Sequence, residues 1–565
     1  MYARLSRTGA GDDDTPESPM DATHRLIEAE AVSRLKAHDV TLYTTAYDER
    51  QSVMQRLGWT DLAEKAPERF ALLDNLRNQL VSEDVTDLVL LGIGGSSLAP
   101  LVLASVLPLP EDAPRLHVLD TTCPSTVDAL MDSLRPETTW FVLASKSGTT
   151  IEPLSLYAIF RAWADHALGR KNAGRRFLVI TDPGTPLDKQ RQHDLMRLAL
   201  SGVPTVGGRF SALTMFGLAP AALLGANVPA LVERARGMEI ACGLPALENP
   251  AAELAAWMHD SYERSADKLT VACSAPLASF GLWVEQLVAE STGKGGVGVV
   301  PVLEDARPES YGPDRAVVVV RLRDDTELAE WAARMKRSHP CFEIVLDDPY
   351  DIGAEFVRWE NAVALLGFLL GINPFDEPDV AAAKSATEQI LKGLRQAPPA
   401  VADLEGVWVT PAGALLADWP APDTLAGALR YALDSLYEPD YLAVLTFLPE
   451  DEALLAPLRD AVRTLSLARG NAACFEIGPR YLHSTGQLHK GGPDTGVFLI
   501  VTARDHTDVP VPGERHTLQM LYRAQAEGDL ATLGERGRRV MRLDLPAGSP
   551  EAVAAFADAL RTASA

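Results

Sequence analysis

The sequence contains few cysteines and few basic residues relative to acidic ones, and both shortages exclude classes of protein. Five cysteines in 565 residues lie far apart and form no Cys-x-x-Cys pair. We therefore expect neither a disulfide scaffold nor a zinc site, and we expect the protein to be in a reducing compartment. The 52 lysines and arginines against 77 aspartates and glutamates give a net charge of −25. This charge argues against nucleic acid or an anionic membrane as the main partner. No His, Asp or Glu cluster has metal-ligand spacing, and no metal or other cofactor is expected.

The chain also lacks an apolar run typical of export or membrane insertion. Residues 1–20 contain no apolar core of a secretory signal, and their Gly, Asp, Pro and Ser content predicts a disordered tail. The longest uncharged stretch, residues 210–232, holds two prolines and two glycines. These favour buried helices joined by a turn over a membrane span. We therefore expect a cytoplasmic protein with no membrane partner.

The composition itself is that of a folded chain. Hydrophobic residues make up 47% and charged residues 23%, which excludes disorder of the whole chain. The length suggests about three or four domains. The acidity raises one question, because an anionic ligand would have to bind against the overall charge. We expect any such site to be a locally positive or neutral cleft on an acidic body.

Short β-rich runs alternate with helical segments in three successive parts of the chain. This βαβα rhythm predicts parallel sheets covered by helices on both faces. The predicted strands are residues 86–93, 115–120, 139–145 and 176–182, then 268–274, 296–302, 315–322 and 341–348, then 441–448, 472–478, 496–502 and 539–545.

The pattern predicts an α/β protein whose domain boundaries lie where the pattern of strands and helices changes. After the tail we place N-terminal helices and a first doubly wound domain at 21–240, a second at 241–398 and a C-terminal α/β domain at 399–565. Residues 394–406, rich in proline and small residues, are a plausible linker.

Two strand-to-helix loops have the chemistry of anion binding. The first, LLGIGGSSLAP over residues 90–100, brings Gly95 and Ser96 to a helix start, where free backbone N–H groups favour an anion. It fits neither the dinucleotide nor the P-loop pattern, so a tight structural turn is an equal alternative. The second loop offers more hydroxyls than a helix cap needs, which suits a phosphate monoester. Its hydroxyl residues are Ser145, Ser147, Thr149 and Thr150.

These two loops, with Ser145-Lys146-Ser147-Gly148-Thr149-Thr150 in the second, resemble the phosphate-binding loops of the phosphoglucose isomerases, which have the sugar isomerase (SIS) fold. The resemblance implies two SIS-type, three-layer αβα domains. It implies that Gly95, Ser96 and the four hydroxyl residues bind substrate.

Two further motifs resemble that family's catalytic signatures. VGGRFSALTMFGL resembles its Gly-Gly-Arg-[Phe/Tyr]-Ser element and implies that Arg209 stabilises a developing enediolate oxygen. VEQLVAESTGKGG resembles its Glu-Ser-[Asn/Thr]-Gly-Lys element and implies that Glu290 is the base that moves a proton between C2 and C1.

GINPFDEPDVAAAK resembles the Asn-Pro-Phe-Asp-Gln-Pro-x-Val signature of the compact bacterial isomerases. The resemblance places Lys384 near the ring oxygen during ring opening. Glu377 stands where Gln is common. Because its charge would disfavour a phosphate, we expect it to face away or to pair with a cation.

YLHSTGQLHKGG resembles the family's His-Ser-x-Gly-Gln element and implies that His483 is the ring-opening acid and base. In the family this element lies between the Glu and Lys motifs, whereas here it follows both. It must reach the site by a different chain path, from its own or a neighbouring subunit. His489 and Lys490 are nearby alternatives.

The resemblance implies an enzyme that interconverts glucose 6-phosphate and fructose 6-phosphate through a cis-enediol(ate), as a homodimer with a small sugar phosphate as its partner. Two alternatives stay open: an isomerase that also accepts mannose 6-phosphate, and a non-catalytic SIS-type sugar-phosphate sensor. The late His motif is similar to the isomerase half of transaldolase–isomerase fusions. Only about 85 residues precede the first Gly-rich strand, too few for a (β/α)8 barrel, so no transaldolase activity is expected.

Overall fold

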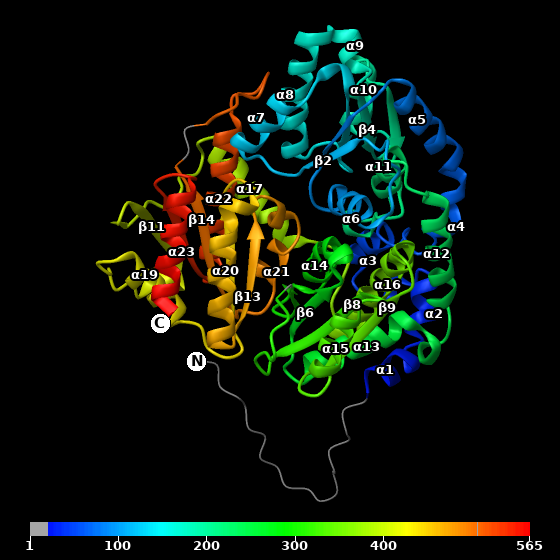
Figure 1. The fold of residues 1–565 in the computed structure, drawn as a ribbon. Helices are drawn as coiled ribbons and strands as arrows, with labels where there is room; N and C mark the ends of the chain where they lie inside the picture. The colour runs from blue at the N-terminus through cyan, green and yellow to red at the C-terminus, as the bar shows by residue number, and fades with distance from the viewer. Residues whose placement is uncertain (1–20, 305, 505–506, 565) are drawn as a thin grey trace, which may run out of the picture.

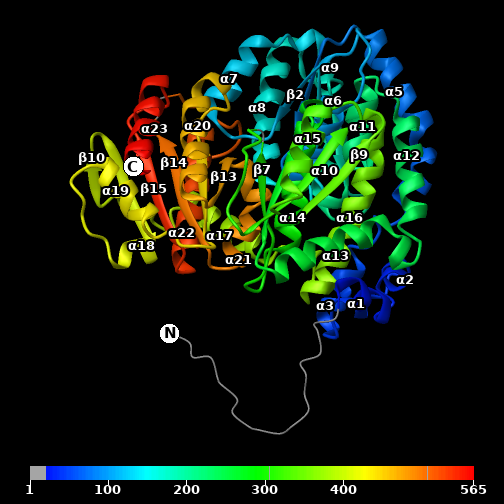
Figure 2. The ribbon, with the colours of Figure 1, turned by 60° about the horizontal axis from the view of Figure 1, so that its bottom comes forward.

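The computed structural model describes residues 21–304, 306–504 and 507–564. The predicted disordered tail, residues 1–20, lies outside them. Three β-sheets follow one another along the chain, each with its own helices (Figure 1). Figures 1 and 2 both show the third sheet and its helices, coloured yellow to red, on one side of the molecule and beside the two sheets that precede it.

The first sheet has five parallel strands in the order β2-β1-β3-β4-β5. Leu88 and Leu90 of β1 face one core, and Val89 and Leu91 face another, so both faces of the sheet are buried as predicted. Four of its strands were predicted, whereas β5 was not because it has only four residues. The strands are β1 (Asp87–Leu91), β2 (Arg115–Leu119), β3 (Thr139–Ala144), β4 (Phe177–Thr181) and β5 (Leu198–Ser201).

Helices cover both faces of this sheet. On one side pack α6 (Leu98–Val106) and α11 (Met215–Leu223), and on the other α7 (Pro124–Ser133), α8 (Ile151–Leu168) and α10 (Pro186–His193). The uncharged stretch at 210–232 contains α11 and the start of α12 (Val228–Ala241), as the prolines and glycines suggested. In the part of the chain that the structure describes, no helix is long and apolar enough to cross a membrane.

The second sheet has four parallel strands in the order β7-β6-β8-β9. Its strands are β6 (Lys268–Cys273), β7 (Val300–Glu304), β8 (Arg315–Leu322) and β9 (Cys341–Leu346). The strand predicted at 296–302 begins only at Val300, because Gly296 and Gly298 have positive φ angles that a strand does not allow. On one face α13 (Pro250–Glu263), α14 (Ala278–Thr292) and α16 (Ile352–Leu370) share a continuous core with the first sheet, and α15 (Thr326–Met335) packs on the other.

The C-terminal sheet is mixed, with the order β10-β11-β15-β14-β12-β13. Four strands were predicted and are parallel to one another; β10 and β11 were not predicted and pair antiparallel. The predicted linker at 394–406 therefore ends too late, since β10 lies inside it. The strands are β10 (Ala402–Leu404), β11 (Val407–Gly413), β12 (Tyr441–Phe447), β13 (Ala472–Ile477), β14 (Gly496–Ala503) and β15 (Arg539–Leu545).

One face of the C-terminal sheet docks on the second domain. On the outer face lie α19 (Leu425–Leu433), α20 (Glu452–Arg469) and α23 (Pro550–Ser564). The inner face carries α21 (Gly486–Gly491) and α22 (Leu518–Glu535), and its apolar core includes Ala289 of α14 and Val300 of β7. Helix α17 (Pro378–Leu391) packs along α22. The predicted fold class, two SIS-type parallel-sheet domains and a C-terminal α/β domain, is confirmed.

Short N-terminal helices complete the fold around the first two domains. They are α1 (Ala22–Glu28), α2 (Ala31–Lys36), α3 (Tyr47–Met54), α4 (Leu62–Lys65) and α5 (Phe70–Ser82). Trp59, between α3 and α4, stacks on Phe210 with ring centroids 5.1 Å apart, and Phe210 lies 5.6 Å from Phe375. Residues adjacent to these rings in sequence belong to the Arg209 and Glu377 motifs, so the aromatic cluster fixes both motifs beside the N-terminal segment.

Candidate active site

Three motifs that are far apart in sequence meet at the first glycine loop. A Cβ atom on Gly95 would lie 2.1 Å from the carbonyl oxygen of Gly208, and one on Gly94 would lie 3.0 Å from His483. Gly94 also has φ +60°. Only glycine permits so close an approach of backbone to backbone, which explains the Gly-Gly pair and brings Arg209 and His483 to the same place.

These motifs surround a cavity of about 390 Å³. Eight of the ten predicted site residues line it: Gly95, Ser96, Ser147, Thr150, Arg209, Glu290, Lys384 and His483. The other two lie close by. Ser145 is buried and its hydroxyl donates to Thr150 Oγ1 at 3.2 Å, while Thr149 lines an adjoining cavity that shares Ser147 and Lys384 with the first.

The second loop places its hydroxyls at the start of α8. The Ser147 and Thr149 hydroxyls are 2.9 Å apart, and the Thr149 N–H donates to Ser147 Oγ at 3.3 Å. Among the described residues, no side chain caps this end of α8. The first-turn N–H groups therefore remain available to an anion, together with the helix dipole.

The basic residues of the cavity counter the acidity of the molecule as a whole. Four basic side chains line it, Arg56, Lys146, Arg209 and Lys384, against the acidic side chains of Asp182, Glu290 and Glu377. Lys146 forms an ion pair with Asp182. Lys384 is exposed, and its side chain forms no hydrogen bond or ion pair with the described residues. The locally positive charge agrees with the cleft expected for an anionic ligand.

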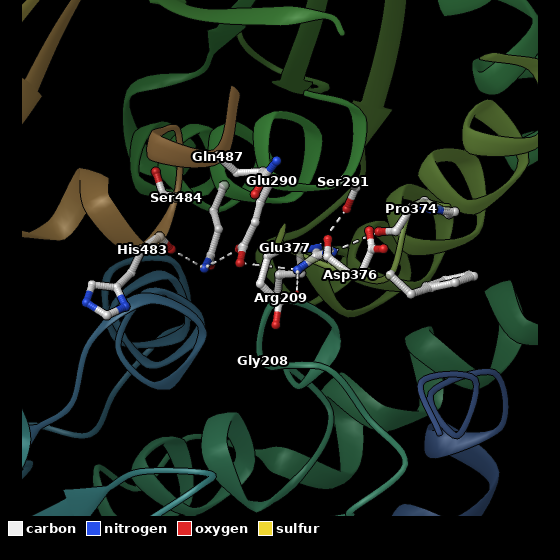
Figure 3. A network of polar contacts seen from close by, with 12 residues as sticks. Gly208, Arg209, Glu290, Ser291, Pro374, Asp376, Glu377, His483, Ser484 and Gln487 are labelled. Atoms are coloured by element: carbon white, nitrogen blue, oxygen red, sulfur yellow. Dashed lines mark hydrogen bonds and ion pairs between the residues drawn. The ribbon is translucent and has the colours of Figure 1, made fainter. Parts of the chain in front are cut away.

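Arg209 is buried and held from several sides, as Figure 3 shows. Its Nε donates to Ser291 Oγ at 2.8 Å, and its Nη2 donates to the Pro374 carbonyl at 2.8 Å and the Asp376 carbonyl at 3.1 Å. Its Nη1 faces the Glu290 and Glu377 carboxylates at 3.2 and 3.1 Å. Because the five N–H donors of a guanidinium have fixed directions, these contacts hold the Arg209 guanidinium in a single orientation.

Glu290 lies in the last turn of α14 and is only 8% exposed. Gln286, one turn earlier, donates from Nε2 to Glu290 Oε2 at 3.2 Å. Burial raises the pKa of Glu290 above its usual value, although Arg209 opposes the rise. A carboxylate with a raised pKa, next to a fixed cation and away from bulk water, is suited to accept a proton from carbon.

Glu377 pairs with cations rather than facing away, which were the two possibilities for this residue. Besides Arg209, its Oε1 lies 3.6 Å from Arg56 Nη2. Burial would raise the pKa of Glu377, but Arg209 and then Arg56 outweigh it, and the pKa is lowered. Glu377 is therefore ionised. Its neighbour Asp376 accepts from Lys294 Nζ at 2.8 Å.

His483 reaches this cavity from the C-terminal domain of the same chain. Its carbonyl accepts from Gln286 Nε2 at 2.8 Å, so Gln286 links His483 to Glu290. Its ring Nε2 lies 2.9 Å from Glu152 Oε1. Burial opposes ionisation of Glu152, yet the contact with His483 prevails and lowers the pKa of Glu152. An ionised carboxylate thus orients the imidazole.

Hydrogen bonds from the C-terminal domain also help to position this histidine. Gln525 of α22 donates from Nε2 to Glu152 Oε1 at 2.8 Å and accepts from the Thr122 hydroxyl at 2.7 Å. Gln487 donates to the Gly293 carbonyl and accepts from the Asp379 N–H, both at 2.9 Å. These bonds join α21 to the end of α14 and the start of α17.

The two alternatives to His483 have other partners. His489 is 1% exposed, with Nε2 3.2 Å from the Glu476 carboxylate and Nδ1 3.0 Å from the Tyr441 hydroxyl. Lys490 is equally buried and its Nζ lies 2.5 Å from Asp529 Oδ1. Both side chains stabilise the C-terminal domain, and neither is among the residues that line the cavity.

Several residues of the site were not singled out from the sequence. Gln286 precedes Glu290 by one helical turn, so helix periodicity could have indicated it. Glu152 lies two residues after Thr150 of the hydroxyl loop, and this nearness in sequence could have indicated it. Arg56 and Gln525 carry no such signal, because they come from segments far away in sequence with no recognisable motif.

Comparison with known proteins points to one family. The family model for phosphoglucose isomerase matches residues 77–301. A glucose-6-phosphate isomerase from Rubrobacter xylanophilus is 30% identical over 358 residues, which cover 54% of this chain and 82% of that protein. The chain belongs to the phosphoglucose isomerase family. A second relative, the glucose-6-phosphate isomerase of Symbiobacterium thermophilum, is 28% identical over 381 residues, or 58% of this chain and 85% of its own.

Two solved structures share the fold. A hypothetical protein from Thermus thermophilus has 27% identity and a TM-score of 0.56, over 66% of this chain and 99% of its own. A glucose-6-phosphate isomerase from Chlamydia trachomatis has 19% identity and a TM-score of 0.53, over 66% of this chain and 85% of its own. The second likeness concerns the fold alone.

Proposed function

We propose that this member of the phosphoglucose isomerase family interconverts glucose 6-phosphate and fructose 6-phosphate. The observation that carries the proposal is the contact between Glu290 and Arg209, which lie 3.2 Å apart in the lining of a cavity whose walls also hold the hydroxyl loop. A base, a cation for the developing oxygen charge and a phosphate cup are the three parts that the reaction needs.

Binding begins with the phosphate. Ser96, Ser145, Ser147, Thr149, Thr150 and the backbone at Gly95 hold the substrate, mostly at its phosphate, where the hydroxyls and the start of α8 supply donors. The remaining length of the sugar then extends toward Glu290 and Arg209, which line the same cavity. Binding at one end thus orients the reacting carbons at the other.

Ring opening is assigned to Lys384 and His483. The proton leaves the C1 hydroxyl and a proton is added to the ring oxygen as the C1–O5 bond breaks, so no net charge is created. Glu152 occupies Nε2 of His483, which leaves Nδ1 to exchange a proton with the substrate. The ammonium of Lys384 supplies positive charge near the ring oxygen.

Proton transfer is assigned to Glu290. Its carboxylate removes the C2 proton of the open aldose, the electron pair moves into a C1–C2 double bond, and O1 gains negative charge that Arg209 stabilises. Glu290 then returns the proton to C1, and the proton of the O2 hydroxyl passes to O1, so O2 becomes the ketose carbonyl and O1 becomes a hydroxyl. Gln286 holds the carboxylate in place through Oε2.

The test is isomerisation in deuterium oxide. The proposal expects fructose 6-phosphate from glucose 6-phosphate, with solvent deuterium entering at C1 or C2. Binding of fructose 6-phosphate without exchange would instead support a sugar-phosphate sensor. Mannose 6-phosphate belongs in the same assay, because it differs only in the configuration at C2 and its turnover would indicate dual specificity.

We also propose a cytoplasmic homodimer, on the basis of the family resemblance. All four residues proposed for catalysis come from one chain, because His483 is supplied by the C-terminal domain of that chain. Light scattering of the purified protein tests the dimer, and fractionation of the source cells tests the location.

A further inference from the structure

Glu377 poses an electrostatic problem for an anion site. It lines the cavity with Ser96 and Ser147, it is ionised, and it competes with Glu290 for the same nitrogen of Arg209. A negative charge in this position repels a phosphorylated substrate. It also draws Arg209 toward itself and away from an oxygen that develops charge during the reaction.

Arg56 lies on the other side of this carboxylate. Glu377 uses its two oxygens separately, with Oε2 3.1 Å from Arg209 Nη1 and Oε1 3.6 Å from Arg56 Nη2. Both Arg56 and Glu377 have side chains that are 31% exposed. Because both are only partly exposed, their attraction is screened less than that of a pair on the open surface.

The N-terminal segment holds Arg56 at this point. Arg56 follows α3 by two residues, and three residues later Trp59 is buried in the aromatic cluster with Phe210 and Phe375. Phe210 follows Arg209 and Phe375 precedes Asp376 and Glu377 in sequence. The same packing that positions both motifs therefore also positions Arg56.

We propose that Arg56 is a positioning residue for the isomerase reaction, which neutralises Glu377 and keeps it from repelling the substrate. This inference rests on the proposed function. Arg56, Glu377 and Arg209 form a triad with one excess positive charge. If Arg56 is lost, Glu377 pairs with Arg209 alone. The negative charge of Glu377 is then poorly compensated on the side that faces the cavity.

The experiment compares R56Q with a matched control, R34Q. Arg34 also lies in the N-terminal helices and pairs with Asp39 at 2.7 Å, with side-chain exposures of 30% and 35%. We expect R56Q to raise KM for fructose 6-phosphate about tenfold at pH 8, with a smaller change in kcat, and R34Q to leave KM unchanged. The phosphate loses its second charge below about pH 6, so the KM ratio of R56Q to wild type falls at pH 5.5.

A second background isolates the role of Glu377. With E377Q present, adding R56Q no longer raises KM, because the charge that Arg56 compensates is gone. The inference is overturned if R56Q behaves like R34Q, or if R56Q raises KM as much in the E377Q background as it does when Glu377 is intact. Failure of the wild-type protein to isomerise either sugar phosphate overturns the proposed function instead, so the two failures are distinct.

Discussion

The Nη1 atom of Arg209 lies 3.2 Å from Oε1 of Glu290, so the proposed base is in direct contact with the cation proposed to stabilise the developing oxygen charge. Burial raises the pKa of Glu290, and the contact with Arg209 opposes this rise. A substrate oxygen that approaches Arg209 weakens this ion pair and makes Glu290 more basic as the reaction begins. Because these side chains contact one another, we expect single substitutions in the site to have distinct effects on binding and on turnover.

Replacing Glu290 by Gln removes the only carboxylate proposed to transfer the proton. We expect kcat to fall about 10³-fold, in the range typical of loss of a general base. Because the phosphate cup is untouched, the dissociation constant for fructose 6-phosphate should change less than about threefold. Calorimetric titration and a coupled assay measure the two quantities.

The matched control is Glu285→Gln on the same helix. Glu285 lines a different cavity, between α14 and the C-terminal domain. We expect the substitution to preserve turnover. Near wild-type turnover of E290Q would mean that another group is the base.

The pH dependence of kcat should carry the signature of Glu290. Burial raises its pKa above the usual value of 4.5, and the base must be ionised, so activity is lost as the pH falls through this raised pKa. The charge of Glu377 contributes to the rise. Substitution of Glu377 by Gln should therefore move the acid limb to lower pH, whereas Glu253→Gln, exposed on α13, should leave it in place. An acid limb that does not move would remove Glu290 as its source.

Gln525→Leu tests whether the C-terminal domain positions the Glu152–His483 pair. The substitution removes the hydrogen bond from Gln525 to Glu152 and frees the carboxylate to rotate. We expect kcat to fall about tenfold, as for a hydrogen bond to a charged group. Turnover of an aldose phosphate too short to close a ring should fall less than turnover of glucose 6-phosphate, because ring opening is the affected step. Equal losses in both would contradict the assignment of His483 to ring opening.

Gly95→Ala tests the close approach of the glycine loop to Gly208. The new Cβ would meet the Gly208 carbonyl at 2.1 Å, so backbone must shift at the centre of the site. We expect the free energy of unfolding to fall by roughly 3 kcal/mol. Gly237→Ala on α12 has no atom within 4 Å of its Cβ and should be neutral or stabilising by up to about 1 kcal/mol. Urea denaturation measures the free energy of unfolding of both variants. Equal values would show that the glycine loop does not pack closely against Gly208.

Much of this architecture could be predicted from local sequence. The strands that precede Gly92 and Ser145 are apolar runs followed by small residues, and periodicity alone indicates them. β10 and β11 were missed because they are a short antiparallel addition at the edge of a mainly parallel sheet. They do not belong to the βαβ pattern from which the other strands were predicted. Motifs located Arg209 and Glu290 in the cavity, since each carries its own local signature.

The rest of the site depends on contacts that sequence order does not reveal. Arg56 reaches Glu377 only because Trp59 packs on Phe210, and Gln525 reaches Glu152 only because α22 docks against the first domain. The path of His483 was likewise unpredictable, because its motif follows those of Glu290 and Lys384 in the chain and yet lines the same cavity as both.

The covalent link between the C-terminal domain and the two SIS-type domains has a consequence for dilution. Gln487 and Gln286 fasten the His483 segment to α14 within one polypeptide, so its encounter with the site is governed by an effective concentration rather than by the amount of protein in solution. Specific activity per chain should thus stay constant across a dilution series.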